Sequence, residues 1–140
     1  MRDYRYIGGE LELFAAAENW KRYMADRLRP FIAGDVLEVG AGIGGTTRHL
    51  VNSSATSWTA LEPDAGLVES LRASLATLDV RHEVCIGTAD DVPPDRRFDT
   101  ILYIDVLEHI SDDAGEMKNA ASRLNAGGRL VVLSPAHPWL

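Results

Sequence analysis

A glycine-rich turn directly after an apolar run is the first part of this sequence whose residue types and spacing could do chemistry. The run 36–39 leads into Gly40-Ala41-Gly42-Ile43-Gly44-Gly45, and a helical pattern follows from Thr46. Glycine tolerates a positive φ and has no Cβ, so the turn can be sharp and a ligand can approach the bare backbone. A buried parallel strand that turns through glycines into a helix is typical of nucleotide-binding folds. The stretch therefore predicts a ligand-binding loop.

The glycines can be grouped in two ways, and the two groupings favour different ligands. Residues 40–45 match the dinucleotide fingerprint Gly-x-Gly-x-x-Gly, and Glu62 follows at the spacing of the acid that binds the ribose of NAD. Residues 38–44 instead read Glu-x-Gly-x-Gly-x-Gly, which places the carboxylate of Glu38 beside the loop. A carboxylate there would repel a pyrophosphate and would favour a ligand that carries an ammonium and a sulfonium. We favour this second ligand, and an NAD(P)-dependent oxidoreductase is the remote alternative.

Alternating apolar and helical patterns predict the elements that position this loop. Strands are expected at 36–40, 57–62, 82–86, 98–103 and 129–134, and helices at 13–31, 42–52, 65–78 and 112–124. In the first helix, Phe14 and Trp20 are expected to pack against the sheet. Strands and helices that alternate at this spacing form βαβ units. The sequence therefore predicts an α/β fold with a doubly wound, mainly parallel sheet and helices on both faces.

The chain ends shortly after its fifth predicted strand, at 129–134. An α/β sheet that ends there leaves its last strand as an apolar edge, so we expect a truncated chain, a degraded chain or a partner that covers this edge. An uncovered edge strand pairs readily with another chain. A homodimer that covers the strand-five edge is therefore one expected assembly.

Acidic residues follow three of the predicted strands. Glu62 ends the second strand, Asp90 and Asp91 lie in the polar loop after the third, and Asp105 follows the fourth. Ligands of open α/β sheets bind outside the carboxyl ends of the strands, so these acids should share one edge with the glycine loop. The Glu62 carboxylate can accept two hydrogen bonds from vicinal hydroxyls there.

Composition limits the classes of function. The 140 residues are 46% hydrophobic and have a formal net charge of −7, which fits one domain and argues against attraction to nucleic acid. One cysteine and four scattered histidines provide no metal-ligand spacing, so no metal site is expected. No apolar run approaches the roughly 18 residues that span a bilayer, and the N-terminus lacks the apolar core of a signal peptide. We therefore expect no membrane insertion and a cytoplasmic protein.

The same stretches, in the same order, resemble the motifs of class I S-adenosylmethionine-dependent methyltransferases. The similarity covers residues 36–44 (first motif), 61–64 (second), 87–93 (third), 98–110 (fourth strand and loop of the small-molecule type 11 and type 12 branch) and 124–130 (turn into the fifth strand). Many members have Lys-Pro-Gly-Gly in that last turn, where this chain has Asn125-Ala126-Gly127-Gly128. Five matches in order, from about residue 35 to residue 135, are far more specific than any one of them.

The resemblance implies a Rossmann-like methyltransferase fold that binds S-adenosylmethionine, transfers its methyl group to a small-molecule acceptor and leaves S-adenosylhomocysteine. Glu62 would bind the ribose hydroxyls, and Asp90 would face the adenine amino group, with Asp91 as the less favoured candidate. Asp105 would face the methionine end of the cofactor. The full expected cofactor set is Glu38, Gly40, Ala41, Gly42, Gly44, Glu62, Pro63, Ala89, Asp90, Asp105 and Val106.

His109, next to Glu108, is the one candidate for a catalytic base. A histidine near neutrality can take a proton from the acceptor as it attacks the methyl group. Methyl transfer from a sulfonium has a good leaving group, however, so positioning can suffice. In the resembling branch the Glu-His pair commonly packs at the cofactor loop, and we therefore favour a structural role and leave the catalytic residue unassigned.

The resemblance also implies how the chain is divided. Residues 1–34 would form an N-terminal helical segment that covers the cofactor site, and residues 35–140 would form the S-adenosylmethionine-binding α/β domain, within one globular unit. The strands beyond the fifth normally complete the substrate side. Their absence motivates the alternative of a non-catalytic module that binds S-adenosylmethionine or S-adenosylhomocysteine.

Overall fold

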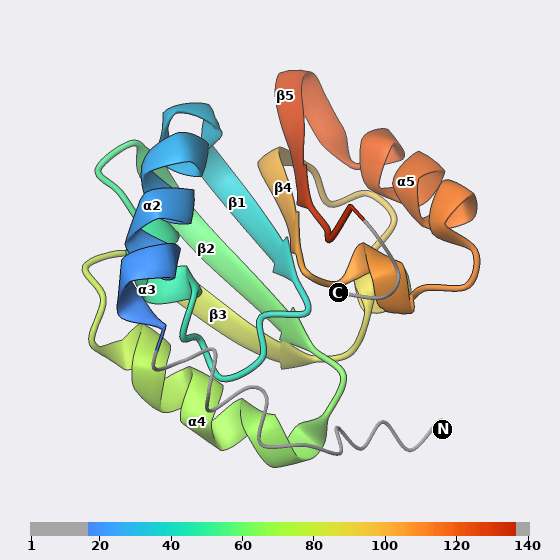
Figure 1. Ribbon diagram of the computed structural model, residues 1–140. Coiled ribbons are helices and arrows are strands. Elements are labelled where there is room, and N and C mark those ends of the chain that lie inside the picture. Colours follow the sequence, from blue (N-terminus) through green and yellow to red (C-terminus); the bar gives the residue numbers. More distant parts are fainter. Residues whose placement is uncertain (1–16, 137–140) are drawn as a thin grey trace.

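The computed structural model of the protein describes residues 17–136 (Figure 1). Helices and 3-10 turns are α2 (Glu18–Leu28), η1 (Arg29–Phe31), α3 (Thr47–Leu50), α4 (Ala65–Ala76), η2 (Ala89–Asp91), η3 (Leu107–His109) and α5 (Asp113–Ser122). The strands are β1 (Gly34–Val39), β2 (Ala55–Glu62), β3 (Arg81–Ile86), β4 (Phe98–Ile104) and β5 (Leu124–Leu133).

The strands form one parallel sheet in the order β3-β2-β1-β4-β5. The chain runs outward from β1 to β3, then crosses to β4 on the other side of β1, so the two directions diverge between β1 and β4. That divergence is where α/β sheets open a crevice for ligands at their carboxyl edge. The predicted doubly wound, parallel α/β fold is confirmed.

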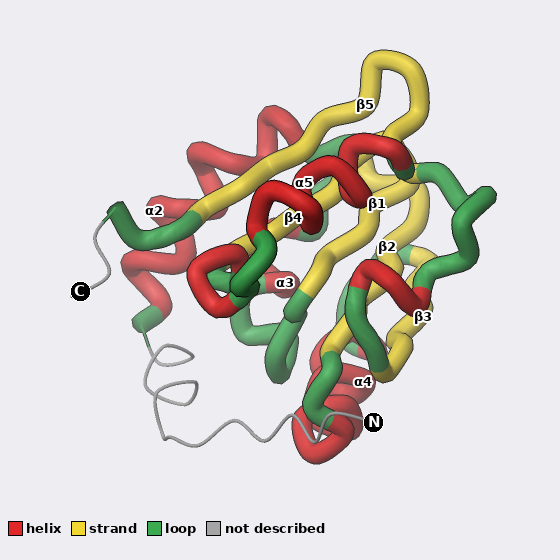
Figure 2. The backbone as a smooth tube through the Cα atoms, turned by 90° about the vertical axis from the view of Figure 1, so that its right-hand side faces the viewer, coloured by secondary structure: helices red, strands yellow, loops and turns green. Residues whose placement is uncertain are grey.

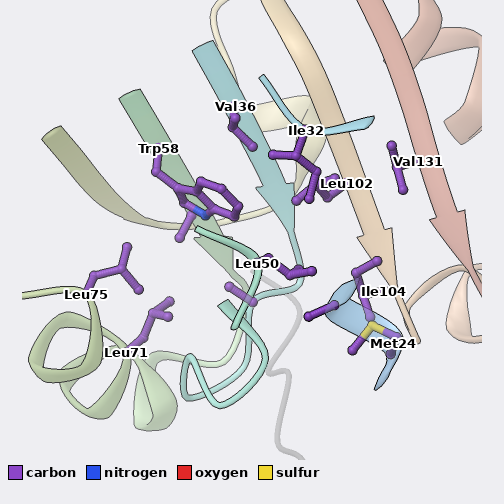
Figure 3. Close-up of a cluster of buried hydrophobic side chains, with 13 residues drawn as sticks. Met24, Ile32, Val36, Leu50, Trp58, Leu71, Leu75, Leu102, Ile104 and Val131 are labelled. Carbon is purple, nitrogen blue, oxygen red and sulfur yellow. The ribbon is translucent and has the colours of Figure 1, made fainter. Parts of the chain in front are cut away.

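Helices cover both faces of the sheet. α2, α3 and α4 lie on one face and α5 lies on the other, so that in Figure 2 α5 stands in front of the strands and α2 behind them. Strand side chains alternate between the faces, which divides the core into two clusters. Under α2–α4 the buried cluster includes Met24, Val36, Leu50, Trp58, Leu71 and Leu102 (Figure 3). Under α5 it includes Leu37, Val39, Leu61, Ile101, Tyr103 and Ala120.

The crossover helix expected at 42–52 is much shorter than predicted. α3 spans only Thr47–Leu50. Gly42 and Gly44 have φ values of 60° and 82°, which are left-handed and cannot continue a right-handed helix. The residues before Thr47 therefore form a series of tight turns rather than the start of a helix.

The N-terminal helix presents a different face to the sheet than its spacing suggests. The expected packing of Trp20 against the sheet is wrong, because Trp20 is 51% exposed and stacks on Tyr23 with ring centroids 5.9 Å apart. Met24, Ala25 and the largely aliphatic side chain of Lys21 face inward instead. The predicted start of this helix, at 13–16, lies outside the described residues, and Phe14 lies there too.

The fifth strand begins earlier than predicted. β5 starts at Leu124, and its pairing with β4 shifts register between Phe98 and Thr100, next to Gly127 with φ 77°. The stretch 125–128, expected as a separate turn, is thus an irregular part of the strand. β5 is an edge of the described sheet, as expected, and a shallow groove beside it is lined by Leu28, Phe31 and residues 129–132.

Candidate functional site

The glycine loop after β1 has a backbone that side chains would disrupt. Gly40, Gly42 and Gly44 all have φ between 60° and 82°. A Cβ on Gly40 would lie 2.6 Å from Val106 Cγ2, and one on Gly44 would lie 2.7 Å from Ser74 Cβ. Both the conformation and the close neighbours therefore require glycine here. Val106 follows β4, so this contact joins the loops after β1 and β4.

Glu62 connects the end of β2 to the glycine loop. Its Oε2 accepts from the Gly42 amide at 2.8 Å, and its Oε1 accepts from the Asp64 amide at 2.9 Å. The residue is 6% exposed, and burial raises the pKa of its carboxyl although the two backbone hydrogen bonds oppose that shift. Each carboxylate oxygen has more than one acceptor position, so both can still accept from a ligand hydroxyl.

Glu38 lies beneath the loop rather than in the open crevice. It is 2% exposed, and its Oε2 accepts from Thr47 Oγ1 at 2.7 Å and from Trp58 Nε1 at 2.9 Å. Burial raises the pKa of its carboxyl to about 7. The sequence predicts a charged Glu38 directly beside the ligand, whereas one of its carboxyl oxygens accepts hydrogen bonds from α3 and β2. Its contact with a ligand stays a prediction.

The two acids after β3 have separate partners. Asp91 Oδ2 accepts from the Thr88 amide at 2.7 Å and from Thr88 Oγ1 at 3.2 Å, which caps η2. Asp90 is exposed, and its Oδ1 accepts from Asn119 Nδ2 of α5 at 2.9 Å. Ala89 between Thr88 and Asp90 is buried. Each acid thus has one carboxylate oxygen engaged, Asp91 within its own turn and Asp90 by α5, and the preference for Asp90 as the acid that faces a ligand stays a prediction.

The segment after β4 begins with a strained residue. Asp105 has φ 55°, and its amide donates to the Leu133 carbonyl at 2.8 Å. Non-glycine residues at positive φ are uncommon and concentrate at functional sites. The residue is exposed overall, yet partial burial of the carboxyl raises its pKa, and Glu108 adds to the increase. Asp105 is thus held in place at the carboxyl edge.

His109 does not enter this cluster through a strong contact. It lies on η3 with a side chain that is 64% exposed, and its Nε2 is 3.8 Å from Glu108 Oε1. Glu108 Oε2 accepts from Ser134 Oγ at 3.2 Å, just past β5. Glu108 therefore connects η3 to the residue after β5, and the structural role favoured for His109 stays a prediction.

Four buried or partly buried residues near these loops were not identified from sequence: Thr47, Trp58, Asn119 and Arg123. Each contacts an expected site residue, or its loop, from 9 or more positions away along the chain. No local spacing rule predicts such contacts.

Among residues 17–136 there is no group of three His, Cys, Asp or Glu side chains that could hold a metal ion. No helix in that range is long and apolar enough to cross a membrane.

Comparisons with known proteins point to one family. The model of a protein family described as "Methyltransferase domain" matches residues 37–130 of this chain. The chain is similar to a demethylmenaquinone methyltransferase of Tropheryma whipplei (strain Twist), with 31% identity over 134 residues that cover 89% of this chain and 52% of that protein. It is also similar to a ubiquinone biosynthesis O-methyltransferase of Azorhizobium caulinodans, with 27% identity over 77% of this chain and 43% of that protein. The chain spans about half the length of these curated relatives.

Solved structures agree with this result. The structure of the DhpI–SAH complex has a TM-score of 0.67 and 31% identity, over 87% of this chain and 61% of that one. The glycopeptide N-methyltransferase MtfA, complexed with sinefungin, has a TM-score of 0.63 and 25% identity, over 81% of this chain and 47% of that one. Because the family description matches more than half of its residues, this chain belongs to the methyltransferase domain family.

Proposed function

We propose that this chain binds S-adenosylmethionine at the carboxyl edge of its sheet and forms the cofactor-binding part of a methyltransferase that acts on a small molecule. The observation that carries the proposal is the contact between Glu62 and the glycine loop. The buried Glu62 carboxylate accepts hydrogen bonds from the Gly42 and Asp64 amides. It lies beside a glycine loop whose open backbone added side chains would obstruct. Such a site offers acceptors to ribose hydroxyls and open backbone to the rest of the ligand.

The residues present fit the cofactor in three parts. Glu62 and Pro63 would hold the ribose, and Ala89 and Asp90 would hold the adenine. Glu38, Gly40, Ala41, Gly42, Gly44, Asp105 and Val106 would surround the methionine end. Four of these eleven residues are acidic and none is basic, which suits a ligand that carries an ammonium and a sulfonium.

The bound cofactor would supply a methyl group on a positively charged sulfur. Transfer to an attacking oxygen or nitrogen is an in-line displacement, so the main task of the chain is to hold the two reactants in line. The strained Asp105 and the Val106–Gly40 contact would fix the methionine end. His109 stays a candidate base of lower rank because its side chain is 64% exposed.

Two features support a small-molecule acceptor. The similar curated proteins include methyltransferases of demethylmenaquinone and of ubiquinone biosynthesis. The net charge of −7 disfavours nucleic acid as the acceptor.

A cytoplasmic location and a homodimer that covers the β5 edge are further predictions from the sequence. A non-catalytic cofactor-binding module is the second candidate function, since the chain spans about half the length of its relatives.

Calorimetry with S-adenosylmethionine, S-adenosylhomocysteine and NAD tests the proposal directly. Both adenosyl ligands are expected to bind in the micromolar range, and NAD is expected to give no heat. Binding of NAD alone would overturn the assignment in favour of an oxidoreductase. If the adenosyl ligands bind but a mixed panel of phenols, quinols and amines is not methylated, the second candidate gains.

A further inference from the structure

Arg123 is a buried cation at the end of α5 without an acidic partner within salt-bridge distance among residues 17–136. It is 6% exposed, and its guanidinium donates to the Pro93 carbonyl at 2.8 Å and to Asn119 Oδ1 at 3.1 Å. Charged side chains are rarely buried without a paired charge because they lose hydration. The position therefore calls for an explanation beyond packing.

The hydrogen bonds of Arg123 determine the direction of the next contact. Arginine can only donate, so the Asn119 side chain must turn its oxygen toward Arg123. Its NH₂ group then faces the other way, where it donates to Asp90 Oδ1 at 2.9 Å. The network thus settles the amide orientation, which atomic positions alone seldom distinguish. Donation runs in one direction, from Arg123 through Asn119 to Asp90.

The network also holds the loop after β3 at two points. Arg123 contacts Pro93 and Asn119 contacts Asp90, so both ends of the segment 90–93 are attached to α5. Ala89 and Val92 pack into the same apolar cluster as Ala120 of α5. Within residues 17–136 the Asp91 carboxylate, by contrast, accepts hydrogen bonds from Thr88 of its own turn alone. α5 therefore positions the side of this loop that carries Asp90.

We infer that Arg123 and Asn119 are positioning residues that aim the Asp90 carboxylate at the six-position of the purine, so that the protein selects adenine over hypoxanthine. This inference rests on the proposed cofactor site. Asn119 occupies Oδ1, and Oδ2 accepts no hydrogen bond from the described part of the chain. An oxygen held in one orientation accepts from the adenine amine but meets the oxygen of a 6-oxo purine as a second acceptor.

The test measures selectivity rather than affinity alone. Dissociation constants for S-adenosylhomocysteine and its 6-oxo analogue, S-inosylhomocysteine, are measured by calorimetry on the 140-residue chain. The wild-type chain should prefer the adenosyl ligand by at least about tenfold. Asn119→Asp keeps the shape of the side chain and the oxygen that accepts from Arg123. It replaces the NH₂ group that donates to Asp90 with a second oxygen, which cannot donate. It should reduce the preference to less than about threefold.

A matched control exists at the opposite edge of the sheet. Asn125 Nδ2 donates to Asp99 Oδ1 at 2.9 Å, the same pairing and distance as Asn119 with Asp90. Asn125→Asp should destabilise the protein to a similar degree and leave the preference unchanged. An unchanged preference in folded Asn119→Asp, or an equal loss in Asn125→Asp, would overturn the inference. If Asn119→Asp does not fold, Asn119→Ala replaces it with the same expected loss.

Two further outcomes separate this inference from the proposed function. Asp90→Ala should also abolish the preference while S-adenosylhomocysteine still binds through Glu62. If Asp90→Ala retains the preference, Asp90 does not discriminate adenine from hypoxanthine, and the hydrogen bonds from Arg123 through Asn119 to Asp90 have no role in selectivity. A wild-type chain that binds neither ligand would overturn the proposed function, and the inference with it.

Discussion

The two halves of the proposed cofactor site are held in place by different groups. The ribose half depends on backbone amides, because Gly42 and Asp64 donate to Glu62. The adenine half depends on side chains, because Asn119 donates to Asp90 from a different helix. Backbone contacts follow from the local path of the chain, whereas side-chain contacts depend on how distant elements pack. The difference suggests that the ribose half is invariant in its geometry and the adenine half can be adjusted by substitutions in α5.

The largest effect is expected from Glu62→Ala, which removes the acceptor of the ribose half. The change removes two hydrogen bonds to a charged group, so binding of S-adenosylhomocysteine should weaken by about a thousandfold, or about 4 kcal/mol. Calorimetry measures the loss. Glu69→Ala is the control, since Glu69 pairs with Arg72 on the surface of α4. A change below about twofold in Glu62→Ala would refute the ribose assignment.

Gly44→Ala tests whether the glycine loop is as rigid as its geometry implies. The new Cβ would strain the left-handed backbone and lie 2.7 Å from Ser74 Cβ. The free energy of unfolding should therefore fall by about 3 kcal/mol. Gly127→Ala separates the two causes, because Gly127 has φ 77° and an added methyl group would meet no atom within 4 Å. It should cost only about 1 kcal/mol and spare ligand binding. Equal losses in denaturant titrations would show that the close contact in the loop is unimportant.

Glu38→Gln should flatten the dependence of stability on pH. The pKa of Glu38 is raised from 4.5 to about 7, so its contribution to stability is fully present below about pH 4.5 and is lost as the pH rises through 7. That loss amounts to about 3 kcal/mol at most, since each pKa unit is worth about 1.4 kcal/mol. Urea unfolding between about pH 5 and pH 8 should therefore show a smaller slope in Glu38→Gln than in the wild type. Identical slopes would mean that Glu38 is not the titrating group, although Glu62, with a pKa raised in the same direction, leaves some slope in both proteins.

The smallest effect is expected from the outer face of α2. Trp20→Ala and Tyr23→Ala remove side chains that are 51% and 54% exposed and stack on each other, with Arg27 over the Tyr23 ring. Stability should change by less than about 0.5 kcal/mol, and cofactor affinity by less than about twofold. A large loss of affinity in calorimetry would instead show that these aromatic rings cover the cofactor, which is the role predicted for the N-terminal segment.

Much of the fold could be predicted because it depends on local pattern. The five strands, their parallel arrangement and the acids at their carboxyl ends follow from apolar runs, glycine clusters and their spacing. The predictions of helix length and of helix packing are wrong where tertiary contacts override local preference. α3 is short because Gly42 and Gly44 adopt positive φ, and Trp20 is exposed because Met24 and Ala25 meet the sheet instead.

The site shows the same division between local and distant causes. Spacing alone indicated Glu62 and the glycine loop, since a strand end and the following turn place them at one edge of the sheet. The burial of Glu38 against Trp58 joins residues 20 positions apart, and the contact of Asp90 with Asn119 joins residues 29 positions apart. A sequence pattern states which residues can ionise or accept hydrogen bonds. The packing of helices on the sheet decides which of those groups face water, which face each other, and which stay available to a ligand.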